Sequence, residues 1–245
     1  MNSASLLLSP DAVSRQAAEL SHAPLTEVLR WAYDTFGMEA AIGTSFQGAG
    51  LVMIHHAVTE GIPLPVFTLD TGLLFQETLA LKHQLEVFFG ITIESVVPLM
   101  TLEEQAVGFG DELWKRRPDT CCQIRKVEPL KERLKTLSMW ITGVRQEQSA
   151  TREGTGILER YLFDPLLERF ILKLNPMHAW GRDAVWEYLK KHGVPYNPLH
   201  DKGYRSIGCH PCTHPSGAEG AERAGRWTGF EKTECGIHTF MPAVR

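Results

Sequence analysis

Short stretches with the pattern of buried strands alternate with stretches of helical periodicity along most of this chain, and this alternation strongly constrains its fold. The expected helices span residues 50–60, 76–89, 130–137 and 182–192, and the expected strands span residues 39–46, 65–70, 91–97, 137–144 and 170–174. Strands separated by helices form βαβ units, in which a largely parallel sheet is covered on both faces. The sequence therefore predicts a single α/β domain with a mostly parallel central sheet flanked by helices.

Three regions are distinguishable along the 245 residues. We expect an N-terminal helical segment over residues 1–35 and an α/β domain over residues 36–215. From residue 195 onward, periodic patterns give way to a stretch rich in Gly, Pro, His and Cys. We expect residues 216–245 to form a flexible C-terminal segment, because terminal stretches of this kind are commonly mobile. The hydrophobic content of 43% suffices for one sizeable core.

The composition disfavours two classes of partner. The formal net charge is −4, so no overall basic field attracts nucleic acid. No apolar run approaches the roughly 18 residues that span a bilayer. The apolar residues 6–8 follow no positive charge of the kind that begins a signal peptide. We therefore expect a cytosolic protein, in which cysteines serve as metal ligands or catalysts more often than as disulfides.

The five cysteines form two close pairs and one single residue. Cys121 and Cys122 are adjacent, Cys209 and Cys212 are separated by two residues, and Cys235 stands alone. Four thiolates match one iron–sulfur cluster or one structural zinc ion. The adjacent pair favours a cluster, because its neighbouring side chains can reach two different irons, whereas zinc ligands are usually spaced apart. Zinc, or buried cysteines without metal, stays an alternative on spacing alone.

The fifth cysteine is a candidate nucleophile. A cytosolic cysteine that is not a metal ligand can attack an electrophile as its thiolate. Cys235 lies ten residues before the last residue, and Lys232 and His238 are nearby cations that would lower its pKa from about 8.5. An inert thiol on a terminal segment is the alternative.

A glycine-containing turn and several basic groups indicate an anion site. The turn at residues 43–48 follows an expected strand and precedes a helix, so its backbone N–H groups could bind a phosphate. It is no Walker A loop, because Ala49 and Gly50 stand where that loop has Lys and Ser or Thr. Arginine forks also suit anions, and basic residues occur in presumed loops at Arg125, Lys126, Arg145, Arg152, Arg223 and Arg226. Each feature alone is also typical of a structural turn or a solvated surface.

Together these motifs resemble the assimilatory adenylylsulfate (APS) reductases, the iron–sulfur branch of the phosphoadenylylsulfate (PAPS) reductase family. The resemblance rests on segments in the family's order: TSFQGAG (44–50), LDTG (69–72), CCQIRK (121–126), TGVR (142–145), NPL (197–199), SIGCHPCT (206–213), RAGRW (223–227) and ECGIH (234–238). PAPS-specific members lack the two cysteine pairs, so the pairs point to the APS branch. The resemblance implies a fold of the adenine nucleotide α-hydrolase type, which binds nucleotide and cluster within residues 36–215.

The resemblance implies a thioredoxin-dependent reductase of sulfate assimilation. Cys235 would attack the sulfur of APS, expel AMP and carry an S-sulfonate that reduced thioredoxin releases as sulfite. The implied catalytic residues are Cys235, His238 and Lys126, and the implied ligands of one [4Fe–4S] cluster are Cys121, Cys122, Cys209 and Cys212. The implied substrate-binding residues are Ser45, Phe46, Gln47, Gly48, Asp70, Thr71, Gly72, Arg145, Arg223 and Arg226. No nucleic acid or membrane partner is expected, and a homo-oligomer is left open.

Three rival functions stay open on the sequence alone. The nearest is a PAPS or dual-specificity reductase. A tRNA-thiolating enzyme or ATP pyrophosphatase of related fold would need an Asp-Ser end to its phosphate-binding turn, which residues 45–50 lack. A zinc-binding protein without enzymatic activity would use all its cysteines structurally. Gln47 and Gly50 depart from the small residue and the acid of many relatives, and Thr228 and Gly229 follow Trp227 where a further tryptophan is common, so the contacts of these two loops are open.

Overall fold

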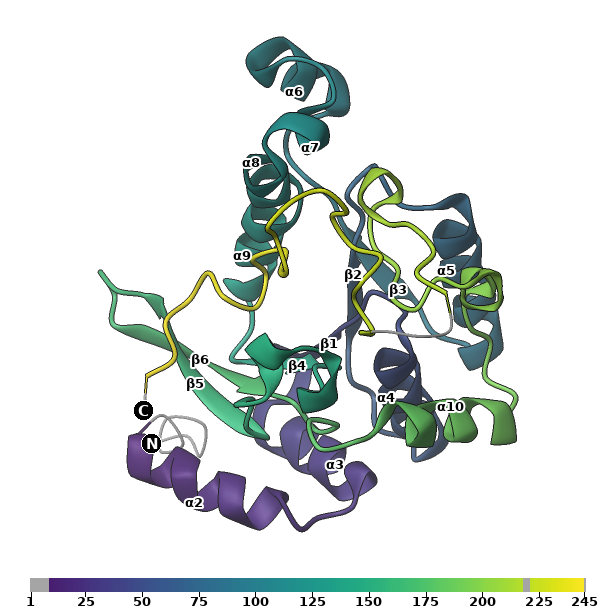
Figure 1. Cartoon of the computed structure of the whole chain (residues 1–245). Helices are drawn as coiled ribbons and strands as arrows, with labels where there is room; N and C mark the ends of the chain where they lie inside the picture. Colours follow the sequence, from purple (N-terminus) through teal and green to yellow (C-terminus); the bar gives the residue numbers. More distant parts are fainter. Residues whose placement is uncertain (1–8, 218–220, 245) are drawn as a thin grey trace.

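Six strands form one central sheet in the computed structural model, which describes residues 9–217 and 221–244 (Figure 1). The strands are β1 (Ala40–Gly43), β2 (Val66–Leu69), β3 (Ile93–Val96), β4 (Met139–Thr142), β5 (Leu158–Asp164) and β6 (Arg169–Leu174). Their order is β3-β2-β1-β4-β6-β5, and every neighbouring pair is parallel except β5 and β6. The predicted α/β fold with a mostly parallel sheet is confirmed.

Helices cover both faces of this sheet. Side chains from five helices enter the larger core: α2 (Pro10–Leu20), α3 (Leu25–Phe36), α4 (Gly48–Thr59), α5 (Gln76–Phe89) and α10 (Arg182–Lys191). On the other face, α9 (Glu128–Leu134) contributes Leu130 and Leu134 to a smaller core. Within the described ranges, no helix has the length and apolar character needed to cross a membrane.

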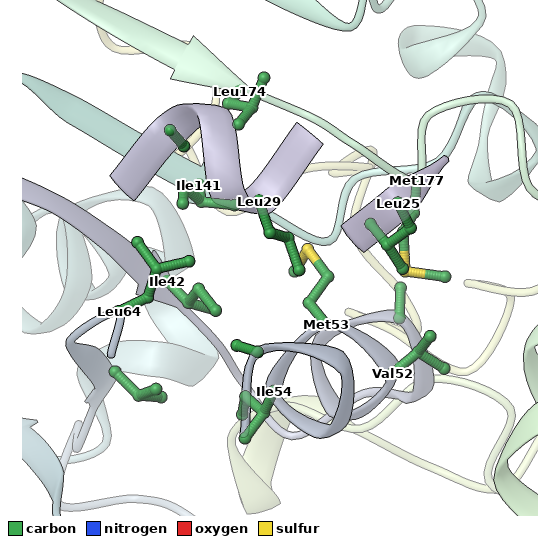
Figure 2. Close-up of a cluster of buried hydrophobic side chains, with 14 of the residues drawn as sticks. Leu25, Leu29, Ile42, Val52, Met53, Ile54, Leu64, Ile141, Leu174 and Met177 are labelled. Carbon is green, nitrogen blue, oxygen red and sulfur yellow. The ribbon is translucent and has the colours of Figure 1, made fainter. Parts of the chain in front are cut away.

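Alternation along the strands divides the core into these two clusters. In β1, Ile42 packs in the larger cluster while the neighbouring Ala41 packs in the smaller one, and Ile141 and Trp140 of β4 divide in the same way. Successive side chains of a strand point to opposite faces, so a strand covered on both faces is apolar throughout. Figure 2 shows the larger cluster, in which side chains of α3 and α4 meet those of the strands.

The predicted elements are present: four of the five predicted strands are shorter than expected, and the strand predicted over residues 170–174 begins one residue earlier, at Arg169. The strand predicted over residues 39–46 ends at Gly43, because the chain turns at Phe46, whose φ of 57° lies in the left-handed region. β5 has no counterpart in the predicted pattern: it is the last strand of the sheet, and its sequence LERYLFD mixes polar with apolar residues. Three short helices also lack a counterpart, and α6 projects from the domain in Figure 1: α6 (Leu102–Phe109), α7 (Leu113–Arg116) and α8 (Pro118–Cys122).

The C-terminal segment passes the carboxyl ends of the strands and finishes on β5 (Figure 1). It follows two 3-10 turns, η5 (Pro198–Lys202) and η6 (His210–Cys212), and its described residues 221–244 contain no helix or strand. Near its end, the N–H of Val244 donates to the carbonyl of Arg160 at 2.9 Å. The described part is thus packed on the domain, while the flexibility expected for residues 216–245 stays a prediction.

Candidate active site

A cavity lies at the carboxyl ends of β1 and β4, where the sheet reverses its strand order. From β1 the chain continues to β2 on one side, and only later returns to β4 on the other. In open α/β sheets, ligands bind at such a switch point. The two strands and the residues directly after them contribute to the cavity lining Gly43, Thr44, Ser45, Trp140, Thr142, Gly143 and Val144.

The turn from β1 into α4 has a shape set by local contacts. The Thr44 hydroxyl accepts a hydrogen bond from the N–H of Phe46 at 2.9 Å, and Phe46 adopts its left-handed φ. The Phe46 side chain therefore enters the core, where it is 1% exposed, while Ser45 and Gln47 line the cavity. A Cβ at Gly50 would collide with the Thr44 hydroxyl, so only glycine allows this close approach. The turn presents backbone N–H groups at a helix N-terminus, which suits a phosphate.

Lysine and arginine side chains give the cavity a cationic lining. They are Lys126, Arg152, Arg223 and Arg226. Arg152 and Arg223 are ion-paired with the same carboxylate, that of Glu234, at 2.9 and 3.2 Å. Glu222 also lines the cavity, so the protein itself balances part of the positive charge of the cavity lining.

Lys126 and Arg226 have no carboxylate partner among the described residues. The ammonium of Lys126 lies 4.0 Å from the sulfur of Cys122, and Nη1 of Arg226 donates to the Ser206 hydroxyl at 3.5 Å. Nε of Arg226 is buried without a hydrogen-bond partner. Burial disfavours the charge of Lys126, but nearby cysteine sulfurs outweigh this effect and raise its pKa. These two cations are therefore placed to bind an anion that enters the cavity.

The Cys235 thiol lines the same cavity and is 9% exposed. Burial disfavours its thiolate, and by itself would raise the pKa. The charge of Lys126, the backbone N–H of Ile237 and then two arginines outweigh burial and lower the pKa of Cys235. A lowered pKa increases the thiolate fraction near neutral pH, which is what a nucleophilic cysteine requires.

The two residues expected to act as cations beside Cys235 are otherwise engaged. Lys232 forms an ion pair with Asp119. The ring of His238 stacks on Trp140, with centroids 5.2 Å apart. Burial, reinforced by neighbouring cations, lowers the pKa of His238 well below its ordinary value. A lowered pKa favours the neutral ring of His238, because the fold buries it among other cations, and its expected role as a cation beside Cys235 stays a prediction.

α8 and η6 bring the two cysteine pairs close to one another. Cys121 and Cys122 are the last residues of α8, while Cys209 and Cys212 lie at the two ends of η6. Burial, followed by the three other sulfurs, raises the pKa of Cys121 to about 12. All four thiols therefore interact, although they belong to segments far apart in the sequence.

This donor set has the number and chemistry that an iron–sulfur cluster requires. Across residues 9–217 and 221–244, the structure shows no group of three or more His, Cys, Asp or Glu side chains that could hold a metal ion as it stands. Four thiols on two elements match a cluster, in which each thiolate binds a different iron. The buried Lys126 also fits, because an anionic cluster beside it would offset its charge.

The structure brings eight of the predicted catalytic and substrate-binding residues to the cavity: Ser45, Gln47, Thr71, Lys126, Arg223, Arg226, Cys235 and His238. Five others are not among its lining residues in the described part of the chain: Phe46, Gly48, Asp70, Gly72 and Arg145. The carboxylate of Asp70 accepts a hydrogen bond from the N–H of Gly72 at 3.0 Å, which shapes the turn after β2. Arg145 is ion-paired with Glu222 at 2.6 Å.

Other cavity residues belong to no sequence motif that would identify them as part of a site. Trp140 is one of several apolar residues in a strand, and Gln148 and Glu222 lie in loops without a motif. Arg152 stands out only as one member of a group of arginines. Nothing local distinguishes these four side chains from core or surface residues, so their place in the cavity follows from the fold.

Comparison with known proteins gives a consistent result. Residues 39–215 match the family model described as phosphoadenosine phosphosulfate reductase domain. Adenosine 5′-phosphosulfate reductase 2 of Bacillus subtilis (strain 168) is 43% identical over 213 residues, which cover 86% of this chain and 88% of that protein. Adenosine 5′-phosphosulfate reductase of Salinibacter ruber is 44% identical over 216 residues, covering 86% and 82%. The crystal structure of PAPS reductase from Candida auris, a phosphate complex, is similar with a TM-score of 0.72 and 28% identity, covering 84% of this chain and 98% of that one.

Proposed function

The chain belongs to the phosphoadenosine phosphosulfate reductase family, and from this premise we propose that it reduces APS to sulfite and AMP in sulfate assimilation. Relatives more than 40% identical to it are named for this activity. The observation that carries the proposal is the placement of Cys235: its thiol, with a lowered pKa, shares one cavity with Lys126 and Arg226. A nucleophile beside unpaired cations suits an anionic electrophile such as APS.

The first step is a transfer of the sulfonate group to Cys235. The thiolate forms a bond to the sulfur of APS, and the bond from that sulfur to the bridging oxygen breaks. AMP leaves with the electron pair, and Cys235 becomes S-sulfocysteine. Lys126 and Arg226 would meet the negative charge that develops on the leaving phosphate and on the sulfonate.

Other cavity groups would position the substrate. The turn from β1 into α4, with Ser45 and Gln47, offers N–H groups to the phosphate. Nδ1 of His238 is buried without a hydrogen-bond partner, so a polar atom of the substrate would satisfy it. We therefore assign His238 to substrate binding as a neutral ring rather than as a cation.

The second step returns the enzyme to its starting form. A thiolate of reduced thioredoxin attacks the sulfur of Cys235, the bond to the sulfonate breaks, and sulfite leaves. The second thioredoxin thiol then attacks the mixed disulfide and frees Cys235, so thioredoxin supplies both electrons. All five cysteines are free thiols here, and we place the enzyme in the cytosol, where they stay reduced.

The same chemistry accommodates one [4Fe–4S] cluster. Its ligands would be Cys121, Cys122, Cys209 and Cys212. When bound, the cluster would supply negative charge beside Lys126 and so tune the electrostatic potential at the substrate. Because the electrons for sulfite formation come from thiols, the chain's own residues carry the reaction.

A single-turnover experiment tests the proposal. Mixed with APS and no reductant, the protein should release one equivalent of AMP and gain roughly 80 Da, one SO₃ group, on Cys235, since a stoichiometric burst is the signature of covalent catalysis. Reduced thioredoxin should then release sulfite. The control variant Cys235→Ser should bind APS but form no adduct. Turnover by that variant, or an adduct on another residue, would rule the mechanism out.

A further inference from the structure

Glu234, the residue before Cys235, joins the C-terminal segment to the body of the domain. Its carboxylate accepts hydrogen bonds from Nε and Nη2 of Arg152, both at 2.9 Å, and from Nη2 of Arg223 at 3.2 Å. Two hydroxyl groups, on Thr151 and Ser149, add longer bonds at 3.3 and 3.4 Å. This set of contacts, called the Glu234 clamp below, contains more hydrogen bonds than a single ion pair.

The Glu234 clamp is shielded from water. The side chains of Arg152 and Glu234 are 10% and 12% exposed. Exposed ion pairs contribute little because solvent screens them, whereas a shielded charge that loses its partner is left uncompensated. Although burial opposes it, Arg152 and Arg223 lower the pKa of the Glu234 carboxyl group, which keeps it ionised. Loss of either partner therefore weakens the attachment of the segment.

Among the attachments of the segment around Cys235, the clamp is the shielded ion-paired one nearest to the thiol. The other nearby ion pair joins Lys232 to Asp119, whose side chain is 84% exposed, so solvent screens it. Arg152 ends η4 (Ala150–Arg152), in the loop after β4, and it lies 82 residues before Glu234. Beyond Cys235, the chain is attached again where Ala243 pairs with Tyr161 of β5. Gly236 lies between the clamp and this pairing with a φ of 85°, which glycine adopts without strain. Opening the clamp would leave the chain before Cys235 held by the solvent-screened Lys232–Asp119 pair, while the pairing on β5 holds its end.

We propose that Glu234 is a positioning residue whose clamp holds Cys235 in the cavity for attack on the substrate, and whose release presents Cys235 to a reductant protein. This inference rests on the proposed function, because a two-step reaction needs the same thiol in two places. At 9% exposure, Cys235 is open to a small molecule inside the cavity but not to the dithiol of a second protein. Because the clamp is a shielded set of ion pairs adjacent to Cys235, removing the charge of Glu234 alone should weaken it.

Hydrogen exchange tests whether the clamp holds the segment. Glu234→Gln keeps the shape of the side chain and removes its charge, and Glu231→Gln is the matched control, because Glu231 is exposed and lies three residues earlier. We expect amide exchange over residues 229–240 to be about tenfold faster or more in Glu234→Gln, because local opening sets this rate. Exchange in Glu231→Gln should match the wild type. Equal exchange in all three proteins would refute the clamp.

The two steps of the reaction test whether the clamp positions Cys235. In Glu234→Gln the AMP burst should slow about 10- to 100-fold, because a misplacement of about 1 Å can have this effect. Release of sulfite by thioredoxin from the fully formed adduct should be as fast as in the wild type, or faster. If both steps slow equally, the variant is merely disordered and the positioning role is refuted. Arg152→Lys, which keeps the charge but loses the two-pronged contact, should show an intermediate burst rate.

The failure of this proposal is distinguishable from failure of the proposed function. Wild-type protein that gives no AMP burst would refute APS reduction, and the hydrogen-exchange comparison alone would then decide the clamp. If Glu234→Gln does not fold, Glu234→Asp and Arg152→Lys provide the same comparison. In either variant, wild-type exchange together with a wild-type burst would overturn the inference.

Discussion

Lys126 reaches the cavity from an irregular turn of helix. Residues Gln123–Val127 form the π-turn η2 between α8 and α9. Such turns are inserted into helices frequently at functional sites, where they change the direction of side chains. Here Nη1 of Arg125 donates to Gln105 at 3.2 Å, whereas the Lys126 ammonium lies beside Cys122 and lines the cavity. Arg125 thus makes contacts within the fold, whereas its neighbour Lys126 faces the cavity.

Replacing Lys126 by Ala should slow the transfer of sulfonate to Cys235 by about 10²–10³, the usual effect of removing one electrostatic stabiliser of a transition state. The cluster should still assemble, because Lys126 is not one of its proposed ligands. The measurement is the single-turnover rate of AMP release, with visible absorbance as the readout of the cluster. Lys135→Ala is the control, since Lys135 is exposed just after α9. A wild-type rate for Lys126→Ala would contradict the role assigned to this cation.

At the scale of elements, α8 carries Cys121 and Cys122, while Cys209 directly precedes η6 and Cys212 ends it. We expect anaerobically purified protein to contain about four irons and four sulfides per chain. A change to Ser at any one of the proposed ligands should abolish incorporation, and these ligands are Cys121, Cys122, Cys209 and Cys212. Cys235→Ser should keep the full complement, which separates the fifth thiol from the other four. Stoichiometric zinc without iron, in a fully active protein, would contradict the assignment.

α4 and α10 meet through a group of histidine and tyrosine side chains. Nδ1 of His55 lies 2.7 Å from the hydroxyl of Tyr188, and the rings of Tyr188 and His192 stack at 4.3 Å. Burial, followed by the charge of His192, lowers the pKa of His55. Burial, followed by the charge of His55, lowers the pKa of His56. This contact therefore favours the neutral form of both imidazoles of α4.

The neutral pair makes stability depend on pH. When the pKa of a histidine is lower in the folded chain, the unfolded chain binds more protons as the pH falls, and the balance shifts toward unfolding. The contribution of His55 and His56 is complete above about pH 6.5 and is lost below it. The double variant His55→Gln/His56→Gln should therefore lose less thermal stability than the wild type between about pH 7 and pH 5.5. Exposed His22→Gln should behave as the wild type, and parallel Tm profiles for all three would contradict the explanation.

The whole molecule gathers several distant parts of the chain around the cavity. They include the turn after β1, β2 with the residues after it, η2 with α9, the loop after β4, residues 206–208 and the C-terminal segment. The C-terminal segment also brings acids to the arginines of the loop: Glu234 pairs with Arg152, and Glu222 pairs with Arg145. The fold thus balances part of its own positive charge and leaves fewer unpaired cations near the cavity.

This balance predicts a preference for APS over PAPS, which carries an additional 3′-phosphate. We expect kcat/KM to favour APS by at least about tenfold, equivalent to about 1.4 kcal/mol. Inhibition by AMP and by adenosine 3′,5′-bisphosphate provides a comparison that depends on binding alone, and AMP should bind more tightly. Equal efficiency with both substrates would instead assign the chain dual specificity.

Local sequence determined the succession of elements and the groups of reactive residues. Helix α5 spans Gln76–Phe89, as its periodicity predicts, because helical periodicity depends on residues three and four positions apart. Cys121 and Cys122 are neighbours in space simply because they are adjacent in the chain. The thiol left over, Cys235, could be singled out by counting.

Only the tertiary structure decided which side chains meet in the cavity. It turned Phe46 into the core, placed His238 on Trp140, and joined Glu234 to Arg152 across 82 residues. It also made Lys126, rather than a residue near Cys235 in sequence, the cation that lowers the pKa of the Cys235 thiol most. These contacts depend on the order in which the strands pair and on the path of the C-terminal segment. Local periodicity contains neither, because it records which face of an element is buried but not which distant element covers it.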